Sequence, residues 1–419
     1  MNALIRSSIA VKGIIAIINF SLIIITANYL GAEGRGKISF FITVLATVQL
    51  FSEVMNGPTI IYLSTRLSMR KKILISSLWA LLVATFAYLI CVHYKYSDSF
   101  MLAFCSWQFS MGSTTLMILQ GHHKIKWYNG LIVLQSCMLI GLFTALLAWT
   151  DTGYSSYPYA FLFSWNIIFI IAVLVILRTL QDRAQDDSYS NTFLQMFKKG
   201  IESQSGNIIA FLNYRLIFYI IAFRTDNAML GFVSTGFAII ESILIIGNGL
   251  GTIQYPAISN HTDPGFPKKI TLQYLSITLW LSLIGLLILN SIPASFYTLV
   301  LGKDFREIKQ VFLILTPGIL FLNLQNIICF YFNGLGLYRI NTIGSFVGLL
   351  SFILLALPGY NGGILPLIAS VSLSYLILCV YMFARFKKHS SSSWKELLSI
   401  FRPPVKILYA VLKGKELAE

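Results

Sequence analysis

The segment GNIIAFLNYRLIFYIIAFR, residues 206–224, is an apolar run about as long as one membrane-spanning helix, with an arginine near its middle. Crossing the hydrocarbon core of a bilayer takes about 20 predominantly apolar residues. Arg215 lies far from both ends of the run, and an arginine that faces lipid at that depth is costly. The segment therefore predicts a transmembrane helix whose Arg215 faces water, a substrate or a partner carboxylate.

The composition extends this interpretation to the whole chain of 419 residues. Hydrophobic residues make up 56%, charged residues only 11%, and mean hydropathy is +0.75, which excludes an ordinary soluble protein. The five cysteines lie inside apolar blocks and indicate no disulfide framework. The net charge of +15 comes largely from basic segments beside apolar runs, which suits contact with anionic membrane lipids and requires no nucleic acid.

The apolar runs predict an all-α polytopic membrane protein with about twelve transmembrane helices. They lie at approximately 10–30, 37–63, 73–93, 99–120, 129–149, 159–179, 203–223, 228–257, 271–293, 308–332, 340–358 and 364–385. The second and eighth runs are longer than a membrane requires, so we expect these helices to be tilted, bent or extended beyond the bilayer.

The basic residues predict the orientation. Most of the 31 Lys and Arg residues fall in the termini and in every second connection, so this side is cytoplasmic and both termini are inside. A weak repeat at an offset of 195 aligns GKIS with GFVS and indicates two parallel halves. The predicted domains are a six-helix lobe over 1–179, a cytoplasmic linker over 180–202, a six-helix lobe over 203–386 and a basic cytoplasmic tail over 387–419.

Motifs for catalysis, nucleotides and metals fail. GAEGRGKI (31–38) resembles a phosphate-binding loop, but Ile38 replaces the required Ser or Thr, and no strand precedes it. The five histidines lie in loops or at span ends without a neighbouring carboxylate. No nucleophile has a base at a recognisable spacing. We expect no enzyme, no cofactor and no metal.

The ionisable residues inside spans are the candidate site. Lys12, Glu53, Arg215 and Glu241 lie in the first, second, seventh and eighth spans, and polar residues accompany each at helical spacing. The predicted substrate-binding residues are Lys12, Asn19, Gln49, Glu53, Asn56, Gln204, Arg215 and Asn248, and the candidate ion-coupling residues are Glu53 and Glu241. Two alternatives stay open: Lys12 reaches lipid headgroups, or Arg215 forms a structural pair with Glu241.

The chain also resembles the Wzx-type O-antigen flippases of the multidrug/oligosaccharidyl-lipid/polysaccharide exporter superfamily. The resemblance rests on YLGAEGRGKISFF (29–41), LNYRLIFYIIAF (212–223), the long stretch from LVLGKDF to GSFVG (299–348) and LPGYNGGILPLIASVSLSYLIL (357–378). Ile217 stands where the family pattern often has an acidic residue after YRL, so the resemblance carries over no coupling carboxylate there.

The resemblance implies two six-helix lobes around a V-shaped cavity in a bacterial inner membrane. It implies the flipping of an undecaprenyl-diphosphate-linked oligosaccharide, an O-antigen repeat unit for lipopolysaccharide, from the cytoplasmic to the periplasmic leaflet by alternating access. Coupling to H⁺ or Na⁺ and contact with other polysaccharide-assembly membrane proteins belong to the same expectation. Arg215 and Lys12 would contact the diphosphate, and the amides would contact sugar.

Two other functions are open. A cation-coupled exporter of drugs or small solutes belongs to the same superfamily, but a cavity for organic cations favours carboxylates, whereas the charges here are balanced. A membrane glycosyltransferase or polysaccharide polymerase usually carries a large outer loop, and the longest outer connection here is about fifteen residues, around 293–307.

Overall fold

A computed structural model describes residues 2–63, 68–150, 152–180, 188–261, 263–359 and 362–404, and these residues form helices and turns without a strand. Parts of the predicted linker (181–187) and tail (405–419) lie outside them. Clustering of contacts divides the chain into two compact units: unit 1 comprises Met1–Ile208 and Ile221–Gly231, and unit 2 comprises Ile209–Ile220 and Phe232–Glu419. The all-α class predicted from the sequence is confirmed.

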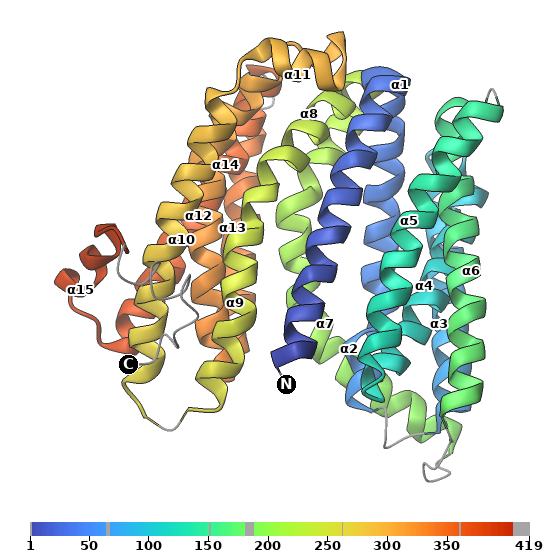
Figure 1. The fold of residues 1–419 in the computed structure, drawn as a ribbon, viewed down its shortest axis with the longest axis horizontal. Coiled ribbons are helices and arrows are strands. Elements are labelled where there is room, and N and C mark those ends of the chain that lie inside the picture. The colour runs from blue at the N-terminus through green and yellow to red at the C-terminus, as the bar shows by residue number, and fades with distance from the viewer. Residues whose placement is uncertain are drawn as a thin grey trace. The chain divides into compact units, whose positions relative to one another are not determined.

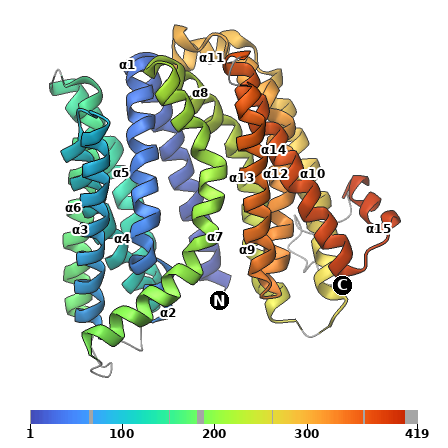
Figure 2. The same cartoon turned by 180° about the vertical axis from the view of Figure 1, so that it is seen from behind.

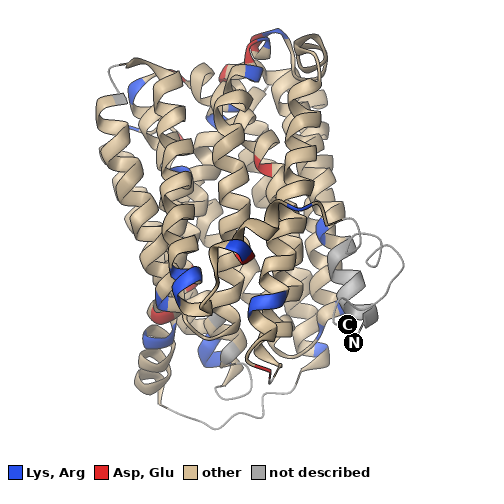
Figure 3. Ribbon diagram, turned by 90° about the vertical axis from the view of Figure 1, so that its left-hand side faces the viewer, with Lys and Arg blue, Asp and Glu red and all other residues tan. Residues whose placement is uncertain are grey.

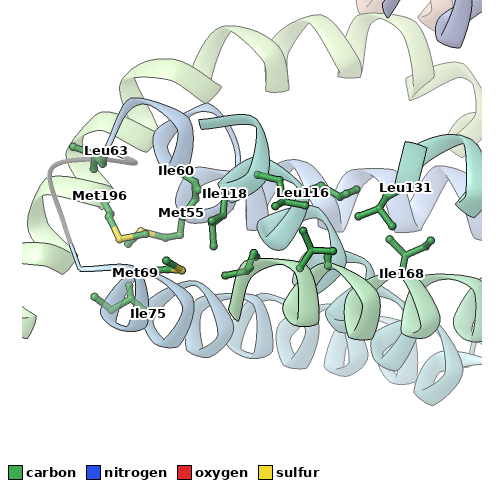
Figure 4. Packing of buried hydrophobic residues seen from close by; sticks show 14 residues of the cluster. Met55, Ile60, Leu63, Met69, Ile75, Leu116, Ile118, Leu131, Ile168 and Met196 are labelled. Carbon is green, nitrogen blue, oxygen red and sulfur yellow. The ribbon is translucent and has the colours of Figure 1, made fainter. Parts of the chain in front are cut away.

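Unit 1 is a bundle of long helices (Figure 1). Its elements are α1 (Asn2–Asn56), α2 (Pro58–Tyr62), α3 (Met69–His93), α4 (Ser99–Gly121), α5 (Ile125–Trp149), η1 (Gly153–Ser155), α6 (Ser156–Thr179) and the first part of α7 (Tyr189–Arg224). Apolar side chains from its helices pack together in a buried cluster (Figure 4), which includes Met55, Leu116, Ile168 and Met196.

The helix α1 contains both of the first two predicted spans. Gly31 interrupts it with φ 64° and ψ −172°, a backbone conformation that L side chains rarely adopt. Both views show α1 as two halves that run antiparallel (Figures 1 and 2). A single glycine thus converts one apolar run of 55 residues into a helical hairpin.

Unit 2 contains residues Ile209–Ile220 of α7, the part of α8 (Asn227–Ile240) from Phe232 onward, and the helices that follow. These are η2 (Glu241–Ile243), α9 (Leu244–Ser259), α10 (Phe266–Ser291), α11 (Ala294–Leu301), η3 (Lys303–Phe305), α12 (Ile308–Gly334), α13 (Tyr338–Gly359), α14 (Ile364–Ser390), α15 (Trp394–Leu398) and η5 (Ser399–Phe401). The helix α12 packs against α9, α10 and α14. Its buried residues include Phe312, Leu315, Ile319, Ile327 and Phe332, which form the core of the unit.

The eighth predicted span is not one helix. It consists of α8, the 3₁₀ turn η2 and α9, so this long run is broken at Glu241–Ile243. The second long run also breaks, at Gly57, after which Pro58 begins α2. The seventh span continues α7 back to Tyr189, and 36 residues at 1.5 Å each extend about 54 Å, well beyond a bilayer core of about 30 Å.

Ten helical stretches among the described residues are long and apolar enough to cross a membrane. One of them, Val11–Ile61, covers the first two predicted spans. The helix α4, 23 residues long, lies at the fourth predicted span but is not among the ten, because buried Ser and Thr residues dilute its apolar character. Charged residues are sparse along the ribbon (Figure 3), which fits a multi-pass membrane protein. Twelve spans stay a prediction.

The last described segment, which follows α14, packs against α10 within unit 2. Ser393 and Glu396 form a reciprocal capping box at the start of α15, and Lys268 Nζ lies 2.6 Å from Glu396 Oε1. The hydrogen bond from Lys268, reinforced by Ser393, lowers the pKa of the Glu396 carboxyl. The beginning of the predicted basic tail is thus held against α10.

Candidate functional site

Unit 1 brings three of the predicted site residues into direct contact. Gln49 and Glu53 lie one turn apart on the second half of α1, and Gln204 comes from α7. The amide of Gln49 is 3.5 Å from one carboxylate oxygen of Glu53, and the amide of Gln204 is 3.4 Å from the other. Both contacts are long for hydrogen bonds. The described residues place no Lys or Arg in ion-pair contact with Glu53, so amides alone hold this carboxylate.

A second layer of polar groups supports the amides. Ser110 Oγ of α4 donates to Gln49 Oε1 at 2.8 Å, and Asn207 Nδ2 donates to Gln204 Oε1 at 2.9 Å. Gly57 leaves room for Gln204, because a Cβ there would lie 2.8 Å from Gln204 Nε2. The result is a chain of polar side chains from α4 through α1 to α7, with the Glu53 carboxylate between two amides.

Asn56 extends this polar cluster by one helical turn. Its side chain is fully buried, and neither amide atom has a hydrogen-bond partner among the described residues. A buried amide without partners costs free energy on the order of 1–3 kcal/mol for each unpaired group. Asn56 therefore has unused capacity to bind a polar ligand or ion beside Glu53.

Unit 2 holds two of the predicted charged residues, Arg215 and Glu241, as an ion pair. Arg215 of α7 donates from both terminal nitrogens to Glu241, at 3.1 and 2.9 Å. The side chains are 31% and 15% exposed, so the bidentate pair is half-buried and still reachable. The Arg215 guanidinium also lies 5.2 Å from the centre of the Phe218 ring, a cation–π contact. The Glu241–Arg215 pair, left open by the sequence, is thus formed.

The remaining predicted residues are exposed. Lys12 and Asn19 lie on the first half of α1, and neither is hydrogen-bonded to another described residue. Asn248 of α9 accepts a weak contact from Asn326 at 3.4 Å. The structure therefore sorts the candidates into a carboxylate–amide cluster in unit 1, a guanidinium–carboxylate pair in unit 2 and three exposed side chains. A common cavity stays a prediction.

Sequence reasoning missed several buried polar residues. Ser110 and Asn323 lie in spans that carry no ionisable residue, so they were not candidates. The segment NLQN, which begins at Asn323 in the tenth run, has three amides within four residues. Arg35 lies between the first two predicted spans, yet it is 6% exposed on α1 near Tyr157. Lys72 precedes the third predicted span, yet it is fully buried and donates to Leu63 O at 3.1 Å. In the sequence, the only signs of these buried residues were single amides inside apolar runs and cations at the ends of runs.

In the part of the chain that the structure describes, no three His, Cys, Asp or Glu side chains gather as a metal site would require, and the five cysteines are free.

The described residues thus form a helical membrane protein with a carboxylate held by amides and an internal ion pair. No protein-family model matches the sequence, and no curated protein matches it in sequence. Solved structures do match the fold. The lipid II flippase MurJ in an inward closed conformation aligns with 98% of this chain and 93% of its own, with a TM-score of 0.77 at 15% identity.

Multidrug resistance transporters of the MATE family in the MOP superfamily match as well. An inward-facing structure covers 90% of this chain and 94% of its own, with a TM-score of 0.71 at 13% identity. An outward-facing structure covers 93% of this chain and 94% of its own, with a TM-score of 0.60 at 12% identity. The chain thus shares the fold of a lipid II flippase and of MATE family transporters.

Proposed function

We propose that this protein is a flippase for a lipid-linked oligosaccharide, an undecaprenyl-diphosphate-linked O-antigen repeat unit in the first instance. The proposal places it in the bacterial inner membrane with both termini cytoplasmic. It would move the headgroup between leaflets by alternating access, next to other polysaccharide-assembly proteins. The likeness to a lipid II flippase along nearly the whole chain is the observation that carries the proposal.

The charges of unit 2 suit an anionic headgroup. A diphosphate accepts paired hydrogen bonds from a guanidinium in the same way as a carboxylate does. Arg215 is already presented in that geometry by Glu241 and is 31% exposed. A diphosphate would therefore replace Glu241 as the partner of Arg215 without requiring a new side-chain arrangement.

The amides of unit 1 suit sugar hydroxyls and a coupling ion. Amide groups both donate and accept, as do sugar hydroxyls. The Glu53 carboxylate has no basic partner among the described residues, so it is the better of the two candidate ion-coupling groups. Glu241 already neutralises Arg215 and would take up a proton or Na⁺ only at the cost of that pair.

The second candidate is a cation-coupled exporter of drugs or small solutes. The MATE likeness and the Glu53 carboxylate, which has no basic partner among the described residues, favour it. Under this proposal Glu53 would contact an organic cation rather than a coupling ion.

Reconstitution of the purified protein in liposomes distinguishes the two functions. A flippase exposes a labelled undecaprenyl-diphosphate saccharide to an impermeant lectin or enzyme at the opposite leaflet, whereas ethidium distribution stays unchanged. The exporter gives the reverse result. Liposomes that lack the protein provide the baseline, and no saccharide exchange above it contradicts the flippase proposal.

A further inference from the structure

The break between α8 and α9 lies beside one buried amide. Asn323 of α12 is completely buried, and both atoms of its amide are used. Its Nδ2 donates to Ile243 O at 3.1 Å, and its Oδ1 accepts from the Gly247 N–H at 3.0 Å. These are the carbonyl and the N–H of the first turn of α9, so the Asn323 amide contacts both groups of that turn.

The same amide ties a third helix to this junction. Asn323 Nδ2 also donates to the buried hydroxyl of Ser282 on α10, at 2.7 Å. Only a glycine at position 247 lets the Asn323 amide lie this close to the α9 backbone, because a Cβ there would collide with Asn323 Oδ1. We call Asn323, Gly247 and the Ile243 carbonyl the amide clamp.

Glu241 stands two residues before the clamped carbonyl, as the first residue of η2. A 3₁₀ turn advances about 120° per residue and an α-helix about 100°, so the three residues of η2 rotate α8 by about 60° relative to a continuous helix. The direction of the Glu241 side chain therefore depends on the break and on what anchors the first turn of α9.

From this geometry we propose that Asn323 is a positioning residue for the ion pair of unit 2. Its amide clamp anchors the start of α9 against α12 and α10, and thereby directs the Glu241 carboxylate to Arg215. The inference deepens the proposed function, since it concerns the pair through which that function would bind its anionic substrate, but its test requires no substrate.

The test is a double-mutant cycle on the full-length protein in detergent, with the apparent melting temperature as readout. Glu241→Gln removes one charge of the pair, and Asn323→Leu removes the amide at similar size. Positioning predicts that the shift caused by Glu241→Gln falls by at least half in the Asn323→Leu background, because the pair is already misaligned there. Equal shifts in both backgrounds overturn the proposal.

Two further variants distinguish a loss of positioning from a general folding defect. Gly247→Ala presses on the Asn323 amide and should reduce the Glu241→Gln shift in the same way. Gly249→Ala, two residues on, is the matched control, because a Cβ there meets nothing within 4 Å. In the Gly249→Ala background the full Glu241→Gln shift is expected.

A transport measurement separates this inference from the proposed function. If the wild-type protein flips the lipid-linked saccharide, Asn323→Leu should raise the concentration for half-maximal exchange at least as much as it lowers the maximal rate. If no exchange is seen but the two shifts are coupled, the positioning role stands and the proposed function falls. If exchange is seen but the shifts are equal, the proposed function stands and the positioning role falls.

Discussion

At the scale of single residues, Arg215 is the cation on which the proposed substrate contact depends. Arg215→Ala should abolish leaflet exchange of a diphosphate-linked saccharide, because it removes the bidentate guanidinium that would bind the diphosphate in place of Glu241. Arg215→Lys keeps the charge but loses the planar bidentate geometry, so we expect an intermediate rate, about ten-fold reduced.

The measurement for Arg215 is exchange in liposomes at matched amounts of inserted protein. Arg385→Ala is the control, since Arg385 is exposed and contacts Tyr381 on its own helix. Normal exchange by Arg215→Ala would remove Arg215 from the substrate site and leave it a structural role with Glu241.

Glu53 supplies the second prediction at this scale. Glu53→Gln should preserve the contacts to Gln49 and Gln204 in part, but it removes the ionisable group. If Glu53 carries the coupling ion, the variant loses its response to an imposed proton or Na⁺ gradient, while wild-type exchange accelerates several-fold. Exchange is measured with and without each gradient.

The comparison for Glu53 is Glu33→Gln, which removes an exposed carboxylate that pairs with Lys37 on the same helix. That variant should respond to the gradient as the wild type does. A gradient response retained by Glu53→Gln would transfer the coupling role elsewhere.

At the scale of elements, Gly31 makes two spans out of one apolar run. An alanine there must adopt φ near 64° with an extended ψ, so Gly31→Ala should destabilise the protein by about 1 kcal/mol or more. Gly141 of α5 offers the opposite case, because a Cβ there meets nothing within 4 Å and alanine is the better helix former.

Melting temperatures of the two variants check this prediction. Gly31→Ala should melt below the wild type, and Gly141→Ala at or above it. An unchanged melting temperature for Gly31→Ala would show that the turn between the two halves of α1 tolerates a side chain.

At the scale of the whole molecule, the predicted count of twelve spans determines the topology. An even count returns both termini to the same side, and the distribution of Lys and Arg makes that side the cytoplasm. Alkaline phosphatase fused after Lys303 should therefore be active, and phosphatase fused after His261 or at the carboxyl terminus should be inactive. Phosphatase activity in intact cells is the measurement, with fluorescent-protein fusions at the same sites as the complement.

Activity of the carboxyl-terminal phosphatase fusion would contradict the prediction, because it would require an odd number of transmembrane spans.

The span pattern was accessible to sequence reasoning because it depends on composition over windows of about twenty residues. The length of the second and eighth runs predicted a tilt, bend or extension, but the positions of the breaks at Gly31 and Glu241–Ile243 were not predictable, because they depend on the backbone angles of single residues. Only part of the candidate site could be predicted from the sequence. Charges inside apolar runs suggest Glu53, Arg215 and Glu241. Nothing in a helical period shows that Ser110 of α4 contacts Gln49, or that Asn323 of α12 contacts the start of α9.

The sequence by itself determined that this is an all-helical, multi-pass membrane protein with a few costly charges, because the cost of placing polar groups in lipid acts on each residue individually. Only the tertiary structure decided how those charges are satisfied: Glu241 neutralises Arg215, while Glu53 rests between two amides. The physical reason is distance. A hydrogen bond or ion pair acts over a few ångströms, and residues 26 and 151 positions apart meet only when whole helices pack.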